Sequence, residues 1–274
     1  MRKKARRHRG TKARSAKREL DRFELYELAV TSPLPLARFL RAVHGRNPRI
    51  LGEDFSGTAA LSRAWVELDP RNRAIAVDQD PAVVASLVAR LSEACASSPI
   101  GNRLRTITAS VLRAKPPCDI LACTNFPICY WHTRPHLLAY LKHARRRLKP
   151  RGIFVADLYG GSSAFQTGKQ TVRLKHRGQR IEYIWEQKMA DPISGRVLNA
   201  IHFRIGKRVL KNAFTYDWRL WSIPELSEAM REAGFRTVEV YDSLGDAMDQ
   251  HGNIIVHPAT ELSDPYIVYV VARK

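Results

Sequence analysis

The 274-residue sequence is poor in cysteine. Its four cysteines form no CxxC pair, so neither a disulfide framework nor a common zinc motif is indicated. Scattered cysteines of this kind are typical of reduced, mostly buried thiols. A zinc site built from Cys123, Cys129, His132 and His136 is the alternative, but its spacing fits no common ligand pattern, and we expect no metal.

Long apolar runs are also missing. No stretch is long enough to span a bilayer, and the N-terminus has no apolar core of a secretory signal. These absences predict a cytoplasmic protein. An apolar fraction of 45% over 274 residues suits one domain with a sizeable core.

Acidic residues are absent from residues 1–18, which hold ten of the Lys and Arg behind the formal net charge of +20. A segment so charged, with almost no apolar residues, cannot bury enough surface to order itself. We therefore expect a disordered basic arm at 1–19, followed by one folded domain at 20–274. Such an arm attracts nucleic acid or another polyanion; the alternatives are a solubilising tail and a start codon set upstream of the true one.

The chain does contain two short apolar segments that each end in acids. The segment RILGEDFSGTAALS (49–62) indicates a buried strand, a tight turn and a helix start, and Ala74–Asp78 indicates a second strand. Gly57 and Asp78 lie 21 residues apart, a spacing typical of a turn beside a nucleoside cofactor and a carboxylate for its ribose. The turn has one glycine and no Gly-Lys-Ser/Thr ending, which favours a cofactor without phosphates.

At these residues the chain resembles the class I S-adenosylmethionine-dependent methyltransferases. Their first motif runs acid-x-G-x-G-x-G, and here Glu53 takes the acid position, whereas Phe55 and Ala59 replace the outer glycines around Gly57. A turn of the Leu-Lys-Pro-x-Gly type, at residues 148–152, is common in the family as well. The resemblance implies S-adenosylmethionine as the cofactor and methyl transfer as the activity.

The implied fold is α/β, a Rossmann-like doubly wound architecture with a mostly parallel seven-stranded sheet. Residues 169–218 interrupt the alternation of strands and helices, because Gln179–Glu186 and Val197–Ile205 alternate apolar and polar residues between turns. We expect an antiparallel insertion of about three strands after the fifth strand. In small-molecule methyltransferases an insertion at this point commonly forms a lid over the acceptor.

The resemblance also assigns cofactor contacts. Asp78 would accept hydrogen bonds from the ribose, or else cap the next helix. Glu53, or its rival Asp54, would reach the methionine amino group. Where many family members carry an adenine-binding acid, this chain has Ser110, a weaker acceptor. The expected cofactor set is Tyr26, Glu53, Asp54, Gly57, Thr58, Asp78, Gln79, Ser110, Asn125 and Phe126.

The loop after the fourth strand and the lid carry the residues expected to act on the acceptor. The loop is similar to the Asn/Asp-Pro-Pro-Tyr loop of amino-group methyltransferases, so Asn125 and Tyr130 are the catalytic candidates, by polarising an amine and by cation–π attraction. Ordinary core aromatics are the alternative. Alternation in the lid places Tyr216 and Trp218 on one face and Arg219, which would suit an anionic acceptor, on the other. The expected acceptor set is Trp131, Tyr216, Trp218 and Arg219.

Three functions are compatible with these patterns. The lid and the aromatic loop favour methyl transfer to a small molecule. The basic arm favours an RNA or ribosome-associated methyltransferase instead. The departures at Phe55, Ala59 and Ser110 favour an inactive nucleic-acid-associated binding protein with the same fold.

Overall fold

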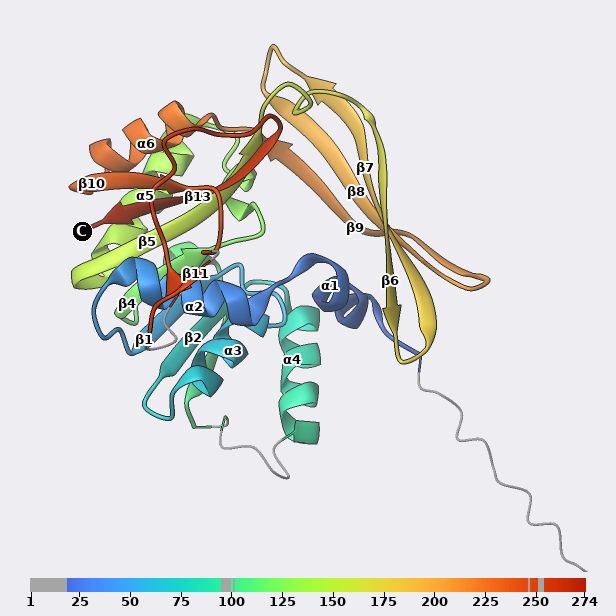
Figure 1. The fold of residues 1–274 in the computed structure, drawn as a ribbon, viewed down its shortest axis with the longest axis horizontal. Helices are drawn as coiled ribbons and strands as arrows, with labels where there is room; N and C mark the ends of the chain where they lie inside the picture. Colours follow the sequence, from blue (N-terminus) through green and yellow to red (C-terminus); the bar gives the residue numbers. More distant parts are fainter. Residues whose placement is uncertain (1–18, 95–99, 101, 246, 251–253) are drawn as a thin grey trace, which may run out of the picture.

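The computed structural model describes residues 19–94, 100, 102–245, 247–250 and 254–274; the side chains of 88–94 are not described. Its centre is a seven-stranded sheet of order β10-β13-β5-β4-β1-β2-β3 (Figure 1). The five strands from β3 to β5 run parallel, and β13 runs antiparallel to both β5 and β10. The expected doubly wound, mostly parallel sheet is confirmed. Its strands are β1 Ile50–Asp54, β2 Arg73–Asp78, β3 Leu104–Thr108, β4 Cys118–Cys123, β5 Leu148–Gly160, β10 Thr237–Tyr241 and β13 Tyr266–Arg273.

Helices cover both faces of this sheet because its inner strands are apolar on both sides. In β4, Ile120 packs toward one face and Leu121 toward the other, each fully buried. Helices α2, α3 and α4 pack on the first face, and α5 and α6 on the second. The helices are α1 Arg22–Val30, α2 Pro33–His44, α3 Ala60–Leu68, α4 Pro81–Ala94, α5 Arg134–Arg147 and α6 Ile223–Glu232, with 3-10 turns η1 Val111–Arg113 and η2 Pro127–Tyr130.

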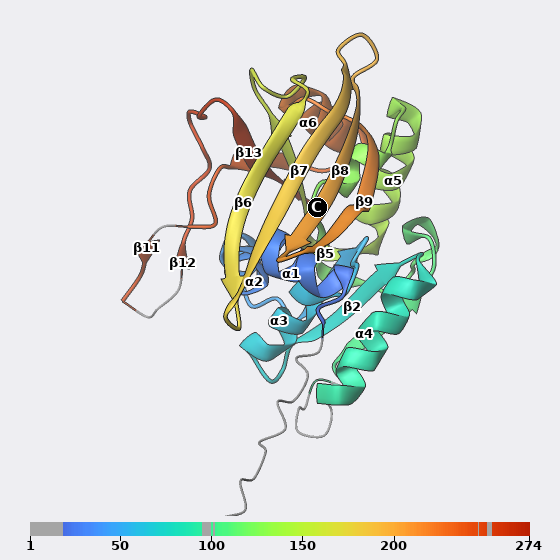
Figure 2. The same cartoon turned by 90° about the vertical axis from the view of Figure 1, so that its right-hand side faces the viewer.

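The insertion after β5 is a separate antiparallel sheet of four strands, which we call the lid (Figures 1 and 2). It has one strand more than the alternation predicted. The additional strand β6 is largely exposed, and its apolar alternation is limited to Val172 and Leu174. The strands are β6 Gly168–His176, β7 Gln179–Asp191, β8 Arg196–Ile205 and β9 Arg208–Arg219.

Helix α1 joins the lid to the rest of the molecule. Asp21 begins the helix with a capping box, accepting from the backbone N–H of Glu24 while the Glu24 carboxylate accepts from the N–H of Asp21. Leu25 then packs with Ile201 and Phe203 of β8 in a small core of their own. The N-terminal element therefore holds the inner face of the lid.

Three further observations complete the fold. A short hairpin, β11 Ala247–Met248 and β12 Ile254–Ile255, was not predicted. The predicted basic arm lies outside the described residues, apart from Glu19. In the part of the chain that the structure describes, no helix is long and apolar enough to cross a membrane.

Candidate active site

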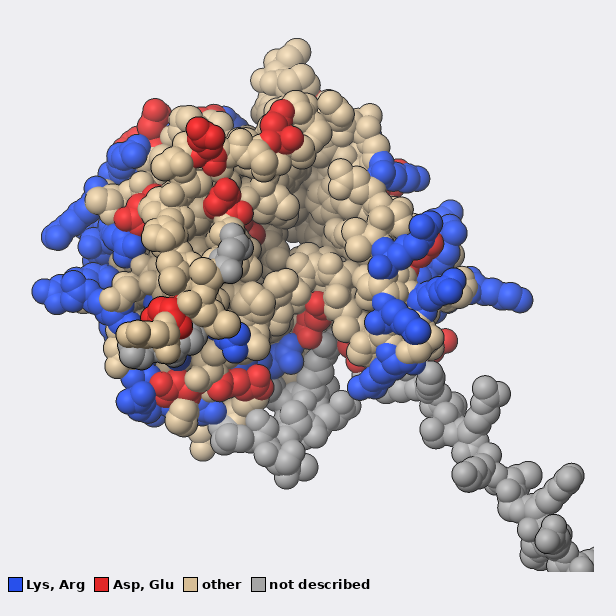
Figure 3. All heavy atoms as spheres, in the orientation of Figure 1, with Lys and Arg blue, Asp and Glu red and all other residues tan. Residues whose placement is uncertain are grey.

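A cavity of about 820 Å³ lies at the carboxyl edge of the parallel strands, between the sheet and the lid. The surface is hollowed at this place in Figure 3. Parallel α/β sheets bind ligands at this edge. One end of the cavity is lined by the loops after β1, β2 and β3, and the other by α1, the loop after β4 and strand β9.

The turn after β1 has a left-handed backbone at three alternate residues. The φ angles are 56° at Phe55, 54° at Gly57 and 54° at Ala59. The Gly57 N–H donates to Asp78 Oδ2 at 2.8 Å. A Cβ atom on Gly57 would meet no atom of the described residues within 4 Å, so this backbone borders open space. The turn therefore presents its backbone to the cavity.

Asp78 ends β2 beside this turn. Besides Gly57, the backbone N–H of Asp80 donates to Asp78, to Oδ1 at 3.0 Å. Each carboxylate oxygen has a second lone pair, and Asp78 lines the cavity together with Gln79 and Thr58. The structure thus brings the predicted ribose-binding carboxylate and the predicted turn together.

Glu53 and Asp54 point to opposite faces of β1, as successive strand residues do. Glu53 lines the cavity and accepts hydrogen bonds from the N–H and hydroxyl of Ser62, at 2.9 and 2.5 Å. Burial raises the pKa of Glu53 to about 7. Asp54 instead accepts from Arg147 at 2.6 Å and from Tyr140 at 3.1 Å on the α5 side. The cofactor assignment of Asp54 is therefore corrected: its carboxylate is committed to a buried ion pair away from the cavity.

Ser110 follows β3 and lines the cavity. Its side chain also accepts from the Leu112 N–H at 3.4 Å, which caps the η1 turn. Contact between Ser110 and an adenine stays a prediction.

The loop after β4 is held in a strained shape by a buried carboxylate. Asn125 and Phe126 have φ angles of 72° and 67°, uncommon for residues other than glycine. Their backbone N–H groups donate to the two oxygens of Asp157, each at 2.7 Å. Burial raises the pKa of Asp157 to about 7. Asp157 lines the cavity and was not among the predicted site residues, although it ends an apolar run in β5 as Asp78 does in β2.

Of the predicted loop residues, Asn125, Tyr130 and Trp131 line the cavity. Phe126 does not: its ring packs edge-on against Tyr159 and Trp218, with centroid distances of 5.2 and 5.9 Å. Its cofactor assignment is corrected to a packing role, with only its backbone N–H tied to Asp157.

Aromatic side chains form the wall at the lid end. Tyr216 and Trp218 stack with their centroids 4.5 Å apart, and Tyr130 lies edge-on to Trp218 at 6.1 Å. Tyr26 of α1 lines the cavity together with Tyr216 and Trp218. Phe214, which sequence reasoning did not single out, adds a ring 5.0 Å from Tyr26. Since β9 alternates, the same pattern that gave Tyr216 and Trp218 would also have given Phe214.

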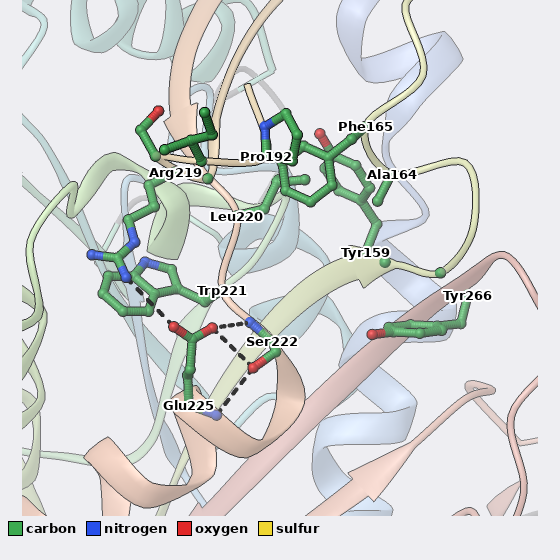
Figure 4. A pocket seen from close by; sticks show the side chains of 15 residues that line it. Tyr159, Ala164, Phe165, Pro192, Arg219, Leu220, Trp221, Ser222, Glu225 and Tyr266 are labelled. Carbon is green, nitrogen blue, oxygen red and sulfur yellow. Dashed lines mark hydrogen bonds and ion pairs between the residues drawn. The ribbon is translucent and has the colours of Figure 1, made fainter. Parts of the chain in front are cut away.

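Arg219 lies outside this cavity. It borders a smaller pocket of about 340 Å³, where Figure 4 shows its guanidinium beside the ring of Trp221 and joined to Glu225. The guanidinium carbon lies 3.9 Å from the Trp221 centroid, and Nη2 lies 3.4 Å from Glu225 Oε1. The acceptor role of Arg219 is corrected, because alternation turns it to the face opposite Trp218.

Metal ligands do not converge among the described residues. Cys118, Cys123 and Cys129 are buried, and burial raises the pKa of each thiol. His132 is hydrogen-bonded to the backbone carbonyl of Asp217 at 2.8 Å. Cys95 lies outside the described residues.

The comparisons with known proteins concern the fold. No protein-family profile matches the chain, and no curated protein matches its sequence. Among solved structures, the chain is similar to an S-adenosylmethionine-dependent methyltransferase from Clostridium acetobutylicum, with a TM-score of 0.64 and 14% identity over 91% of this chain and 96% of that one. It is also similar to the CcbJ methyltransferase from Streptomyces caelestis, with a TM-score of 0.66 and 15% identity over 92% of this chain and 96% of that one. A third match is the sugar N-methyltransferase KedS8 from Streptoalloteichus, with a TM-score of 0.64 and 17% identity over 100% of this chain and 99% of that one.

The chain therefore has the fold of the class I S-adenosylmethionine-dependent methyltransferases. This confirms the fold expected from the resemblance.

Proposed function

We propose that the chain transfers a methyl group from S-adenosylmethionine to a small-molecule acceptor. The observation that carries this proposal is one continuous cavity. It joins the Gly57 turn and Asp78 at one end to the aromatic wall under the lid at the other. A methyl transferase needs two sites that share one space, because donor and acceptor must meet in line.

The cofactor end fits an uncharged ribose and a methionine moiety. The open backbone at Gly57 allows close approach, and Asp78 keeps lone pairs for the ribose hydroxyls. Glu53, which lines the cavity, is proposed to bind the methionine amino group. Tyr26, Thr58, Gln79, Ser110 and Asn125 complete the proposed cofactor contacts.

The acceptor end supplies position rather than strong chemistry. Methyl transfer from a sulfonium is an in-line displacement, so holding the reactants in line and excluding water provides much of the acceleration. Asn125 and Tyr130, from the loop after β4, line the cavity, and they are the proposed catalytic residues. Trp131, Tyr216 and Trp218 are proposed to hold the acceptor.

A small acceptor is favoured because the lid and α1 wall the cavity. The matched KedS8 structure is of a sugar N-methyltransferase, which agrees with an acceptor of this size. Contact of the basic arm with a polyanion stays a prediction.

Titration calorimetry with S-adenosylmethionine and S-adenosylhomocysteine tests the proposal. We expect saturable binding to the intact chain and at least tenfold weaker binding to Asp78→Ala. The matched control is Asp217→Asn, which removes a half-exposed carboxylate paired with Arg196 on the outer face of the lid. Absence of binding to the folded wild-type chain would refute the cofactor assignment. Equal binding by Asp78→Ala would refute the role of Asp78.

A further inference from the structure

The charge of the cavity is opposite to that of the chain. The protein carries a formal net charge of +20, and residues 168–219 hold twelve Lys or Arg against four Asp or Glu. These basic side chains gather on the side of the lid that faces away from the hollow (Figure 3). Within the cavity, the described lining has one Lys or Arg, Arg22, and four acids: Glu53, Asp78, Asp80 and Asp157. Such a cavity opposes an anionic acceptor and favours a cationic one.

Three of the four acids lie at the cofactor end. Glu53, Asp78 and Asp80 surround the turn after β1 and the end of β2. Asp157 alone comes from β5, next to the loop after β4. Among the described residues no Lys or Arg forms an ion pair with it. Its carboxylate accepts two backbone N–H groups, which leaves a lone pair on each oxygen.

Asp157 is close to the aromatic wall. The backbone N–H of Phe126 donates to Asp157 Oδ1 at 2.7 Å, and the Phe126 ring packs edge-on against Trp218 with a centroid distance of 5.9 Å. Trp218 in turn stacks on Tyr216, with centroids 4.5 Å apart. A cation beside Asp157 would therefore also lie near electron-rich rings, whose faces attract cations. Arg22, at the rim, already lies 4.7 and 5.5 Å from the ring centroids of Phe23 and Phe214.

We infer that the acceptor is an amine that enters as its ammonium ion, and that Asp157 is the group that takes its proton. This inference rests on the proposed function and names its acceptor class. The ammonium N–H proton passes to an oxygen of Asp157, and the freed nitrogen lone pair forms the new N–C bond. The C–S bond of the donor breaks with its electron pair on sulfur. The methylated nitrogen becomes cationic again and remains beside the aromatic wall.

The acid–base chemistry of Asp157 agrees with this role. A general base works best when its pKa lies near the operating pH, and burial raises the pKa of Asp157 to about 7. The two backbone N–H donors fix the carboxylate relative to Asn125 and Phe126. The two hydrogen bonds that hold the loop in its strained conformation thus also fix the orientation of the Asp157 carboxylate.

A pair of probe ions of similar shape tests the inference without knowledge of the acceptor. Benzyltrimethylammonium and phenylmethanesulfonate each place a tetrahedral charged group on a benzyl ring, with opposite charge. Their affinities for the protein loaded with S-adenosylhomocysteine are measured by calorimetry and by quenching of tryptophan fluorescence. We expect the cation to bind at least tenfold more tightly than the anion. Equal affinities, tighter anion binding or binding of neither ion would overturn the inference.

Two variants assign the preference to named groups. Asp157→Asn should weaken cation binding about tenfold, measured at saturating S-adenosylhomocysteine. Tyr130→Leu, at a side chain that is 42% exposed and so tolerates truncation, should weaken cation binding about threefold. Asp217→Asn, the matched carboxylate control, should leave cation binding unchanged. Unchanged cation binding in both cavity variants would refute the site.

Failure of this inference is distinguishable from failure of the proposed function. If S-adenosylhomocysteine does not bind the wild-type chain, the cofactor proposal fails. If it binds and the cation shows no preference, only the amine acceptor and the role of Asp157 fail.

Discussion

Replacement of Arg147 by methionine should destabilise the fold severely. Arg147 and Asp54 form an ion pair at 2.6 Å, with side chains 2% and 0% exposed. Removal of one partner from such a pair leaves a buried charge without compensation, which costs about 3–5 kcal/mol. We expect the free energy of unfolding of Arg147→Met to fall by that amount.

The double variant Asp54→Asn/Arg147→Met should recover about 2 kcal/mol or more of this loss, because no buried charge remains. The asparagine keeps an oxygen that can accept from the Tyr140 hydroxyl, now 3.1 Å from Asp54 Oδ2. Two hydrogen-bond donors of Arg147, Nε and Nη2, have no partner in the part of the chain that the structure describes. Their removal therefore strands no acceptor, which adds to the expected recovery.

The measurement is equilibrium urea unfolding followed by circular dichroism and tryptophan fluorescence, together with calorimetric titration of S-adenosylmethionine. Equal stabilities of the single and double variants would refute the buried-charge reasoning. The double variant should also bind the cofactor within about threefold of wild type, because Asp54 faces α5. If the folded double variant binds S-adenosylmethionine more than tenfold more weakly than wild type, Asp54 belongs to the cofactor site after all.

Three further predictions concern the site and its support. Ala59 has a φ of 54°, a conformation that costs an L-residue about 1–2 kcal/mol. The free energy of unfolding of Ala59→Gly, measured with urea, should therefore equal or exceed that of wild type although a buried methyl group is lost. The control Ala139→Gly, at an exposed helix position, should lower the free energy of unfolding by about 1 kcal/mol. Equal losses in the two variants would contradict this reasoning. Burial raises the pKa of Glu53 from 4.5 to about 7. Glu53 thus ionises at a lower pH in the unfolded chain than in the folded chain. The free energy of unfolding therefore falls as the pH rises from about 4.5 to about 7. Glu53→Gln should lack this fall, so its free energy of unfolding should gain up to about 3 kcal/mol relative to wild type over that pH range. A difference between variant and wild type that does not change with pH would contradict the prediction. Ser222→Ala should lower stability by about 1 kcal/mol, read from thermal unfolding, because it removes the capping box with Glu225, and Ser222→Asp should retain most of it.

The sheet was predictable because its signal is local. A strand buried on both faces is a short apolar run, and the run predicted at 74–78 is β2 in the structure, longer by Arg73 alone. Strand β6 was missed for the opposite reason. It carries Lys169, Arg173 and Lys175 and is held by pairing with β7 rather than by burial.

The site was only partly predictable, because contacts between distant segments decide it. The spacing of Gly57 and Asp78 found a contact 21 residues apart, which the structure forms at 2.8 Å. Nothing local distinguishes Glu53 from Asp54, since the choice depends on whether Ser62 or Arg147 faces each carboxylate. Asp157 was overlooked because its partners, the N–H groups of a loop about 30 residues away, have no side-chain signature.

The departures from the glycine motif gain a physical explanation from the turn itself. Phe55 and Ala59 stand where the motif has glycine, and both have the same left-handed φ as Gly57. The motif is thus a requirement on backbone conformation, which glycine meets without strain and other residues meet at a cost of about 1–2 kcal/mol each. At Phe55, contacts with Tyr130 and Trp131, with ring centroids 6.0 and 6.2 Å away, are of a kind that can offset such a cost. Only the central position, where the backbone borders open space, keeps its glycine. A search for this turn in other sequences should therefore demand glycine at the middle position alone and accept an aromatic residue at the first where an aromatic loop follows the fourth strand.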